Sequence, residues 1–231
     1  MSEAVHAMFS DIAPRYDLAN SILSLGIHHL WRSNTVKASG AKQGSSVLDC
    51  ATGTGDLALA FKRVVGPTGR VIGTDFNADM LSFAPAKALR KGLDVTFEVA
   101  DAMNLQYADA SFDVASISFG IRNVDKPIVA LGEMARVVKP GGRIVVLEFG
   151  QPRGLMGTTY RWYSKNVIPF IGGLITGHRK AYEYLPTTAA AFPCRDEFLS
   201  LMKDTGRLDN CYYKELTGGI AYLYVGTVVP L

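Results

Sequence analysis

Residues 45–56 read SSVLDCATGTGD, and this stretch decides the fold. Val47 and Leu48 favour a strand, which ends at the acid Asp49. The chain then turns through Gly53 and Gly55 into an apolar pattern of helical spacing. A strand, a glycine turn and a helix in this order place backbone N–H groups and a helix N-terminus around one small cavity. A ligand site is therefore predicted at this turn.

Carboxylates flank the glycine turn, since Asp49 precedes it and Asp56 follows it. A nicotinamide dinucleotide carries a pyrophosphate, which nearby carboxylates would repel. An organic cation, such as the sulfonium of S-adenosylmethionine, suits the same charges better. The sequence therefore favours S-adenosylmethionine as the cofactor.

The turn also supports an alternative of another class. Gly53-x-Gly55-x-x-Ala58 satisfies a relaxed dinucleotide motif, and Asp75 follows about twenty residues further on. An acid beside the turn can also serve simply as a helix cap. An NAD(P)-dependent oxidoreductase therefore stays open at this point.

The composition is that of a globular protein with one domain. A chain of 231 residues with 48% hydrophobic and 19% charged residues can bury one substantial core. A net charge of +3 without a basic run argues against a nucleic-acid partner. Cys50, Cys194 and Cys211 are widely spaced and form no CxxC pair, so reduced thiols are expected, with neither disulfide nor metal site.

The sequence gives no sign of a targeting or membrane-spanning segment. The first residues, MSEAVHAMFSDIAPRYD, lack an apolar stretch behind a basic one, so no signal peptide is predicted. The most lipid-like stretch, 167–175, is expected to be broken at Pro169, Gly172 and Gly173 and is too short to cross a bilayer. A cytoplasmic protein is expected, with peripheral membrane association left open.

The hydrophobic pattern divides the chain into four parts of a single domain. These are a helical cover at 1–44, a cofactor-binding core at 45–150, a helical insertion at 151–193, and a C-terminal helix and hairpin at 194–231.

The core alternates between strand and helix patterns, which predicts a doubly wound, mostly parallel α/β sheet. The expected strands are 47–50, 71–74, 95–99, 112–118 and 143–148; the expected helices are 56–65, 77–91 and 128–138, with a sharp turn at 139–142. The segments 211–216 and 220–229 predict an antiparallel hairpin, which makes the sheet seven-stranded. Such a hairpin is typical of Rossmann-like class I S-adenosylmethionine-dependent methyltransferases rather than of dehydrogenases.

Polar side chains fall at the carboxyl ends of the predicted strands, where ligands bind in such sheets. Asp75 is placed to accept hydrogen bonds from both ribose hydroxyls. Asp101 is placed to accept from the adenine amino group, and the Ala102 N–H to donate to a ring nitrogen. Phe76 could cover the adenine, while Thr54 and Ser118 face the methionine portion. The candidate cofactor contacts are Asp49, Gly53, Thr54, Gly55, Asp75, Phe76, Asp101, Ala102 and Ser118.

Two longer motifs resemble a known family. Tyr16-Asp17-x-x-Asn20-x-x-Leu23-Ser24-x-x-x-His28-x-x-Trp31 is similar to the first signature of the UbiE/MenG family of ubiquinone/menaquinone biosynthesis C-methyltransferases. Arg136-Val137-Val138-Lys139-Pro140-Gly141-Gly142, continuing to Leu147-Glu148, resembles its second signature. Ala19, Thr52 and Gly150 depart from the family's usual Met, Gly and Ser. The resemblance covers nearly the whole chain.

The resemblance implies methyl transfer from S-adenosylmethionine to a ring carbon of a reduced, prenylated quinone. Demethylmenaquinol is the preferred acceptor, and 2-polyprenyl-6-methoxy-1,4-benzoquinol of the ubiquinone pathway is the alternative. The oligomeric state stays open, with a homodimer as one option.

The ring carbon becomes nucleophilic when a neighbouring hydroxyl, with a pKa near ~10, loses its proton. Arg122 is the candidate that stabilises the resulting phenolate, with Asn123 holding a water that accepts the proton. A structural ion pair between Arg122 and an acid such as Asp17 is the alternative. His28 is the alternative base.

The remaining candidates surround the acceptor. Tyr16, Asp17, Asn20 and Trp31 are expected to shape a lid over the substrate ring. The aromatic stretch that includes Trp162, Tyr163 and Phe170 is expected to meet the isoprenoid tail or a membrane surface.

Overall fold

The computed structural model describes residues 3–230, so the predicted limits at residues 1 and 231 lie outside the described part of the chain. Its centre is a seven-stranded sheet in the order β3-β2-β1-β4-β5-β7-β6. The strands are β1 (Ser46–Cys50), β2 (Arg70–Asp75), β3 (Thr96–Val99), β4 (Phe112–Ser118), β5 (Val138–Phe149), β6 (Leu208–Leu216) and β7 (Ala221–Val228). The first five are parallel, whereas β7 is antiparallel to both β5 and β6. The predicted doubly wound sheet with its C-terminal hairpin is confirmed.

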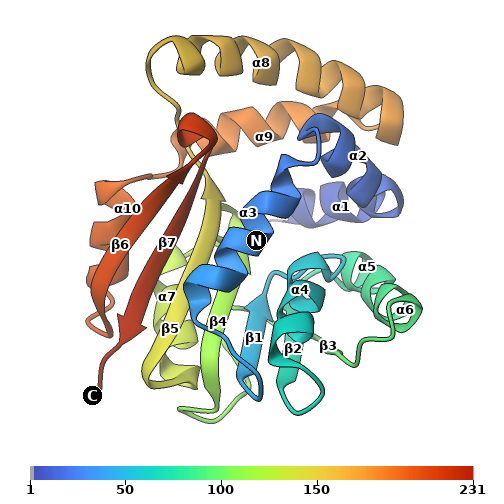
Figure 1. The fold of residues 1–231 in the computed structure, drawn as a ribbon. Helices are drawn as coiled ribbons and strands as arrows, with labels where there is room; N and C mark the ends of the chain where they lie inside the picture. The colour runs from blue at the N-terminus through green and yellow to red at the C-terminus, as the bar shows by residue number, and fades with distance from the viewer. Residues whose placement is uncertain (1–2, 231) are drawn as a thin grey trace.

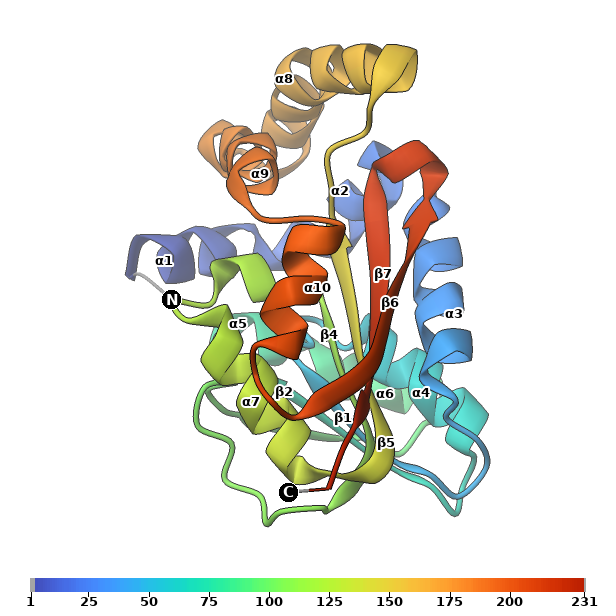
Figure 2. The ribbon, with the colours of Figure 1, turned by 90° about the vertical axis from the view of Figure 1, so that its left-hand side faces the viewer.

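Helices cover both faces of the sheet because neighbouring residues of the central strands point to opposite sides. Val47 of β1 packs with Phe61, whereas Leu48 packs in the cluster that contains Leu131. The helices on the first face are α3 (Ile27–Ser39) and α4 (Asp56–Val65); those on the second are α7 (Pro127–Val137) and α10 (Asp196–Lys203). Figure 2 shows these layers, with the sheet between the two pairs of helices.

Two predictions about local structure were wrong. The helix expected at 77–91 is split at Ser82 into α5 (Ala78–Leu81) and α6 (Phe83–Arg90). Pro85 has no N–H to bond the Leu81 carbonyl, which favours a break before it, and it lies in the first turn of α6, where a proline is tolerated. The turn expected at 139–142 lies inside β5 as a bulge. Phe112 of β4 pairs with Val138, and Val114, two residues later, pairs with Arg143, so residues 139–142 form the extra length on β5.

The first part of the N-terminal cover, residues 3–23, lies over the carboxyl ends of the parallel strands, whereas its last helix, α3, runs along the first face of the sheet (Figure 1). The cover consists of α1 (Glu3–Ile12), the short helix η1 (Ala13–Arg15), α2 (Tyr16–Leu23) and α3. Pro14 lies in η1, and Gly26, with φ of +76°, allows the turn from α2 into α3. The helical character predicted for this part of the chain is confirmed.

The helical insertion forms two helices beyond the same ends of the strands, α8 (Gly154–Thr176) and α9 (Arg179–Ala191) (Figure 1). The break expected at Pro169 is wrong, because α8 continues through this residue. Within residues 3–230, no helix is both long and apolar enough to cross a membrane. After α10, the hairpin of β6 and β7 turns through the short helix η3 (Thr217–Gly219).

Candidate active site

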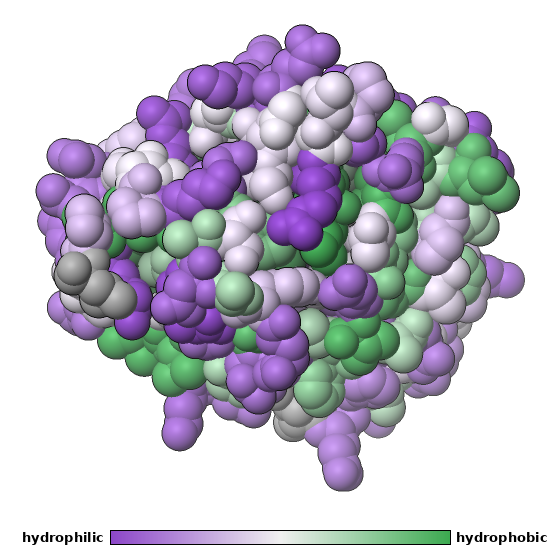
Figure 3. Space-filling view, turned by 90° about the horizontal axis from the view of Figure 1, so that it is seen from below, coloured by the Kyte–Doolittle hydropathy of each residue, from purple (hydrophilic) through white to green (hydrophobic). Residues whose placement is uncertain are grey.

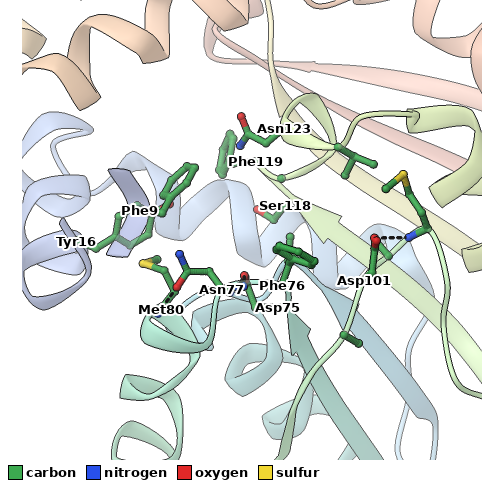
Figure 4. Close-up of a pocket in the computed structure, with 17 residues that line it drawn as sticks. Phe9, Tyr16, Asp75, Phe76, Asn77, Met80, Asp101, Ser118, Phe119 and Asn123 are labelled. Carbon is green, nitrogen blue, oxygen red and sulfur yellow. Dashed lines mark hydrogen bonds between the residues drawn. The ribbon is translucent and has the colours of Figure 1, made fainter. Parts of the chain in front are cut away.

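Two cavities adjoin each other between the strand ends and the helices above them. The smaller has a volume of about 100 Å³ and the larger a volume of about 400 Å³. Phe9, Tyr16 and Phe119 line both of them. Figure 4 shows the smaller cavity, with Phe9 and Tyr16 on the side of the cover and Asp75, Phe76 and Asp101 at the ends of β2 and β3.

Asp75 is held in the smaller cavity by backbone donors. Its carboxylate accepts hydrogen bonds from the backbone N–H groups of Gly53 and Asn77, both at 2.8 Å. Burial raises the pKa of Asp75, although these backbone N–H groups oppose the shift. Gly53 supplies its N–H in the left-handed backbone conformation, with φ of +56°. The glycine turn and the end of β2 therefore form one unit.

The other side of the smaller cavity follows β3 and β4. Asp101, Ala102 and Ser118 all line it, and Asp101 accepts a hydrogen bond from the Met103 N–H at 2.9 Å. Phe76 lines it as well and stays 47% exposed. The structure thus brings together Gly53, Asp75, Phe76, Asp101, Ala102 and Ser118 of the predicted cofactor contacts.

Three predicted contacts lie behind the wall of the cavity instead. Asp49 is buried and accepts from Thr52 Oγ1 at 2.6 Å and from Ser116 Oγ at 2.7 Å. Burial raises its pKa to about 6. Gly55 begins α4 with φ of +86°, and a Cβ there would lie 3.0 Å from Ala84. Asp49 and Gly55 therefore shape the turn from behind.

Thr54, the third of these residues, belongs to a charged network that the sequence did not reveal. Its hydroxyl donates to Asp17 at 2.6 Å and accepts from Lys87 Nζ at 2.9 Å. Lys87 is buried and also pairs with Asp17 at 2.5 Å and with Asp56 at 2.9 Å. This Lys87 network connects the cover, the glycine turn and α6.

Asp56 extends the network to α3, because Arg32 lies 3.1 Å from its carboxylate. Burial raises the pKa of Asp56, but Arg32 and Lys87 outweigh it and the net shift is downward. The sequence offers one signal for this network. Lys87 falls at a buried position of a helical pattern, and a buried charge requires a partner.

The charges around the smaller cavity fit a cationic cofactor. Among the described residues that line it, Asp75 and Asp101 are acidic and none is Lys or Arg. Such a lining suits a sulfonium ion and would repel a pyrophosphate. S-adenosylmethionine therefore fits the residues present.

The larger cavity lies between the cover and the helical insertion, and its lining is largely apolar and aromatic. Tyr16, Asn20, His28 and Trp31 all line it, whereas Asp17 turns away into the Lys87 network. Trp31 is fixed by a hydrogen bond from its Nε1 to Thr217 Oγ1 at 2.9 Å. Burial lowers the pKa of His28 to about 4, with Arg32 and His29 adding to the effect.

Arg122 reaches the larger cavity from the short helix η2 (Ile121–Asn123). Its Nη1 donates to Glu148 at 2.7 Å and to the Phe119 carbonyl at 2.6 Å. The alternative of a structural ion pair between Arg122 and an acid is confirmed, but the acid is Glu148 at the end of β5 and not Asp17, which binds Lys87. Arg122 Nε is buried and has no hydrogen-bond partner among the described residues.

Asn123 is the neighbour of Arg122 and lines the smaller cavity. Its Oδ1 accepts a hydrogen bond from the Tyr184 hydroxyl at 3.0 Å. Tyr184 belongs to α9 and lines the larger cavity. Asn123 therefore connects the lining of the smaller cavity to that of the larger one, and its amide nitrogen donates no hydrogen bond to the described residues.

Proteins of known structure share this fold. A methyltransferase from Thermotoga maritima, described as S-adenosylmethionine-dependent and a possible histamine N-methyltransferase, superposes with a TM-score of 0.67 at 21% identity; 96% of this chain and 99% of that one are covered. An S-adenosylmethionine-dependent methyltransferase from Aquifex aeolicus superposes with a TM-score of 0.64 at 20% identity. The superposition covers 86% of this chain and 89% of that one. At these identities, the likeness establishes the fold alone.

Sequence relatives are much closer. The "Ubiquinone/menaquinone biosynthesis C-methyltransferase UbiE" of Bdellovibrio bacteriovorus is 60% identical over 98% of this chain and 96% of its own. The "Demethylmenaquinone methyltransferase" of Thermus thermophilus is 46% identical over 95% of this chain and 99% of its own. The profile of the ubiE/COQ5 methyltransferase family matches residues 1–228. The NAD(P) alternative is therefore wrong and the predicted resemblance is confirmed: this chain belongs to the ubiE/COQ5 methyltransferase family and depends on S-adenosylmethionine.

Proposed function

We propose that this protein transfers a methyl group from S-adenosylmethionine to a ring carbon of demethylmenaquinol, which yields menaquinol. Menaquinone occurs in the names of both relatives described above, and the Thermus protein is named for this step alone. The benzoquinol of the ubiquinone pathway is the competing acceptor.

The observation that carries the proposal is the wall that the two cavities share. An acidic cavity at the strand ends and a larger apolar cavity under the insertion meet at Phe9, Tyr16 and Phe119. A cation bound in the first and an apolar ring bound in the second would face each other across this wall. Phe119 is stacked on Phe149, with ring centroids 4.3 Å apart, so one side of the wall is rigid.

When bound, S-adenosylmethionine supplies an electrophilic methyl group on a positively charged sulfur. The residues of the smaller cavity bind and orient this cofactor. Asp75 is held by two backbone N–H groups and keeps acceptor capacity for ribose hydroxyls. We assign Asp101 and the Ala102 N–H to the adenine, with Phe76 against its face, because all three residues line this cavity. We assign Ser118 to the methionine portion.

Arg122 is proposed to stabilise the phenolate of the acceptor ring. A phenol with a pKa near ~10 ionises poorly at neutral pH unless a cation or hydrogen-bond donor lowers that value. Glu148 holds the guanidinium in place through Nη1, and Nε is a buried donor that has no partner among residues 3–230. An orphaned buried donor costs about 1–3 kcal/mol, and a ligand oxygen would remove this cost.

The proton is proposed to leave through a water held by Asn123. His28 is the weaker candidate, because a pKa of about 4 makes it a poor base toward a phenol. Asn123 already binds Tyr184 through its oxygen, so its amide nitrogen can orient a water at the boundary of the two cavities.

The cover is proposed to open when the cofactor binds. A volume of about 100 Å³ lies below the range of about 300–1,000 Å³ that is usual for small-molecule sites. Phe9 and Tyr16 of the cover line this cavity, and the contacts of Asp17 with Thr54 and Lys87 hold the cover down.

The test compares two short-tailed quinols as acceptors. The protein is incubated with methyl-labelled S-adenosylmethionine and either demethylmenaquinol or the benzoquinol, both kept reduced. We expect kcat/KM to be at least about ten-fold higher for demethylmenaquinol, since the larger, two-ring acceptor buries more surface in the apolar cavity. Equal or higher turnover of the benzoquinol contradicts the proposed acceptor, and methylation of neither contradicts the quinone function.

A further inference from the structure

The mouth of the larger cavity is surrounded by exposed apolar side chains. Leu25, Met156 and Trp162 line this cavity, yet Leu25 is 83% exposed and Trp162 is 63% exposed. A side chain can have both properties only at the opening of a cavity toward solvent. Tyr163 of α8 donates to the Leu23 carbonyl at 2.9 Å, which brings α8 beside the turn that carries Leu25.

The exposed apolar residues continue along one face of α8. Leu155, Trp162, Phe170 and Leu174 are seven, eight and four residues apart, which places them on one broad face of the helix, and all are exposed, Leu155 to 85% and Leu174 to 70%. Burying such side chains in water-free surroundings is favourable, so an uncovered row of this length indicates a partner. On the opposite face of the molecule, hydrophilic residues are interspersed with separate apolar patches (Figure 3).

Positive charge accompanies this apolar row. Residues 153–180 contain five basic residues and no acidic one: Arg153, Arg161, Lys165, Arg179 and Lys180. The whole chain, in comparison, carries a net charge of only +3. Arg161 and Lys165 lie four residues apart beside the apolar row, both exposed, and form no ion pair within residues 3–230.

We propose that α8 and the turn at Leu25 form a docking surface for a bilayer that contains anionic phospholipid. An amphipathic helix with an aromatic and aliphatic face beside lysine and arginine lies in the headgroup region of such bilayers. In this orientation the mouth of the larger cavity opens directly onto the lipid. The role of this surface in substrate access rests on the proposed function; the binding itself does not.

Vesicle binding tests the surface without any activity measurement. The full chain is floated with vesicles of phosphatidylcholine alone or of phosphatidylcholine mixed with phosphatidylglycerol. We expect binding to the mixed vesicles, weaker binding at high salt, and a shift of tryptophan emission to shorter wavelength. Trp162 is the exposed reporter, because Trp31 is buried, so Trp162→Phe abolishes the shift while vesicle binding persists.

Matched variants locate the contact. Leu155→Ser combined with Leu174→Ser is expected to weaken binding at least about ten-fold. Arg161→Ala and Lys165→Ala are expected to weaken it by about five-fold each. The controls are on α6, which lies away from α8 (Figure 1): Leu89→Ser, at a site 82% exposed, and Arg90→Ala leave binding unchanged. Thermal unfolding confirms that each variant is folded.

Several results would overturn the proposal. They are absence of binding to the mixed vesicles, equal binding to neutral vesicles, and equal losses in the α6 controls. A dimer that dissociates in the Leu155→Ser, Leu174→Ser variant would also overturn it, because a second copy would then cover the surface. Turnover of a short-tailed quinol without vesicle binding refutes the docking surface alone, whereas vesicle binding without turnover of either quinol refutes only the proposed function.

Discussion

The two cavities differ in how they are built. The smaller one uses residues at or just beyond the ends of strands, such as Asp75 at the end of β2 and Ser118 at the end of β4. The larger one is assembled from the cover, η2, α8 and α9, which are far apart in the sequence. The first is therefore a consequence of the sheet topology, while the second exists only once two helical segments pack over it.

The largest expected effect that distinguishes the two cavities is the loss of turnover when Arg122 is replaced. Arg122→Lys keeps a positive charge near Glu148 but removes Nε and the planar fork. We expect kcat to fall about 10²–10³-fold, with the dissociation constant of S-adenosylhomocysteine unchanged in calorimetry. Arg179→Lys, at an exposed site on α9, is the control. Equal losses of turnover and cofactor affinity would show that Arg122 serves both cavities.

The next largest effect is expected at Asp75, on the cofactor side. Asp75→Asn loses the negative charge and one acceptor, so the affinity for S-adenosylhomocysteine should fall by roughly 30–100-fold. Asp79→Asn, at an exposed position on the nearby α5, should leave the affinity unchanged. An unchanged affinity in the Asp75 variant would remove this residue from the cofactor site.

A smaller effect is expected where the cover meets the core. Asp17→Asn removes the charge that pairs with Lys87, but an amide oxygen can still accept from Thr54. The Asp17 side chain is 42% exposed, so solvent screens the pair, and we expect the free energy of unfolding to fall by no more than about 1 kcal/mol. Cofactor exchange measured by stopped flow should become faster. Asp94→Asn is an exposed control, and equal exchange rates in both variants would contradict a closed cover.

The smallest effect concerns His28 and pH. Its pKa is about 4 in the folded protein, against 6.5 ordinarily. Between these values the unfolded chain holds a proton that the folded chain lacks, so stability falls as pH falls from about 6.5 toward 4. Because the ring lines a cavity that water can enter, we expect His28→Gln to reduce this loss by only about 1 kcal/mol. Urea denaturation at about pH 7.5 and about pH 5 measures it; identical losses in both proteins would argue against a buried neutral ring.

The strand ends could be predicted from sequence because their position depends on local patterns. Apolar runs locate the buried strands, and the residue after each run must lie at the carboxyl edge of a parallel sheet. Asp75, Asp101 and Ser118 were found in this way. Asp49 obeyed the same rule but lies behind the turn, because Thr52 and Ser116 occupy its oxygens. The pattern gives the edge of the sheet but not the direction of the side chain.

Partners that join distant segments could not be predicted. The sequence suggests an acid such as Asp17 as a partner for Arg122, yet Glu148 holds it, because β4 and β5 are neighbours and their ends meet. Lys87 binds Asp17 and Asp56 only because α6 packs beside the glycine turn and beneath the cover. The choice among several carboxylates is made by packing.

The sequence alone determined the order of strands and helices, the glycine turn, the acids at the strand ends and the family resemblance, because each depends on residues that are close together in the chain. Only the tertiary structure decided that Arg122 is held by Glu148, that Lys87 ties the cover to the core, and that an apolar cavity opens between α8 and the Leu25 turn. These features depend on how separate helices pack, and a local pattern carries no information about which surfaces will meet.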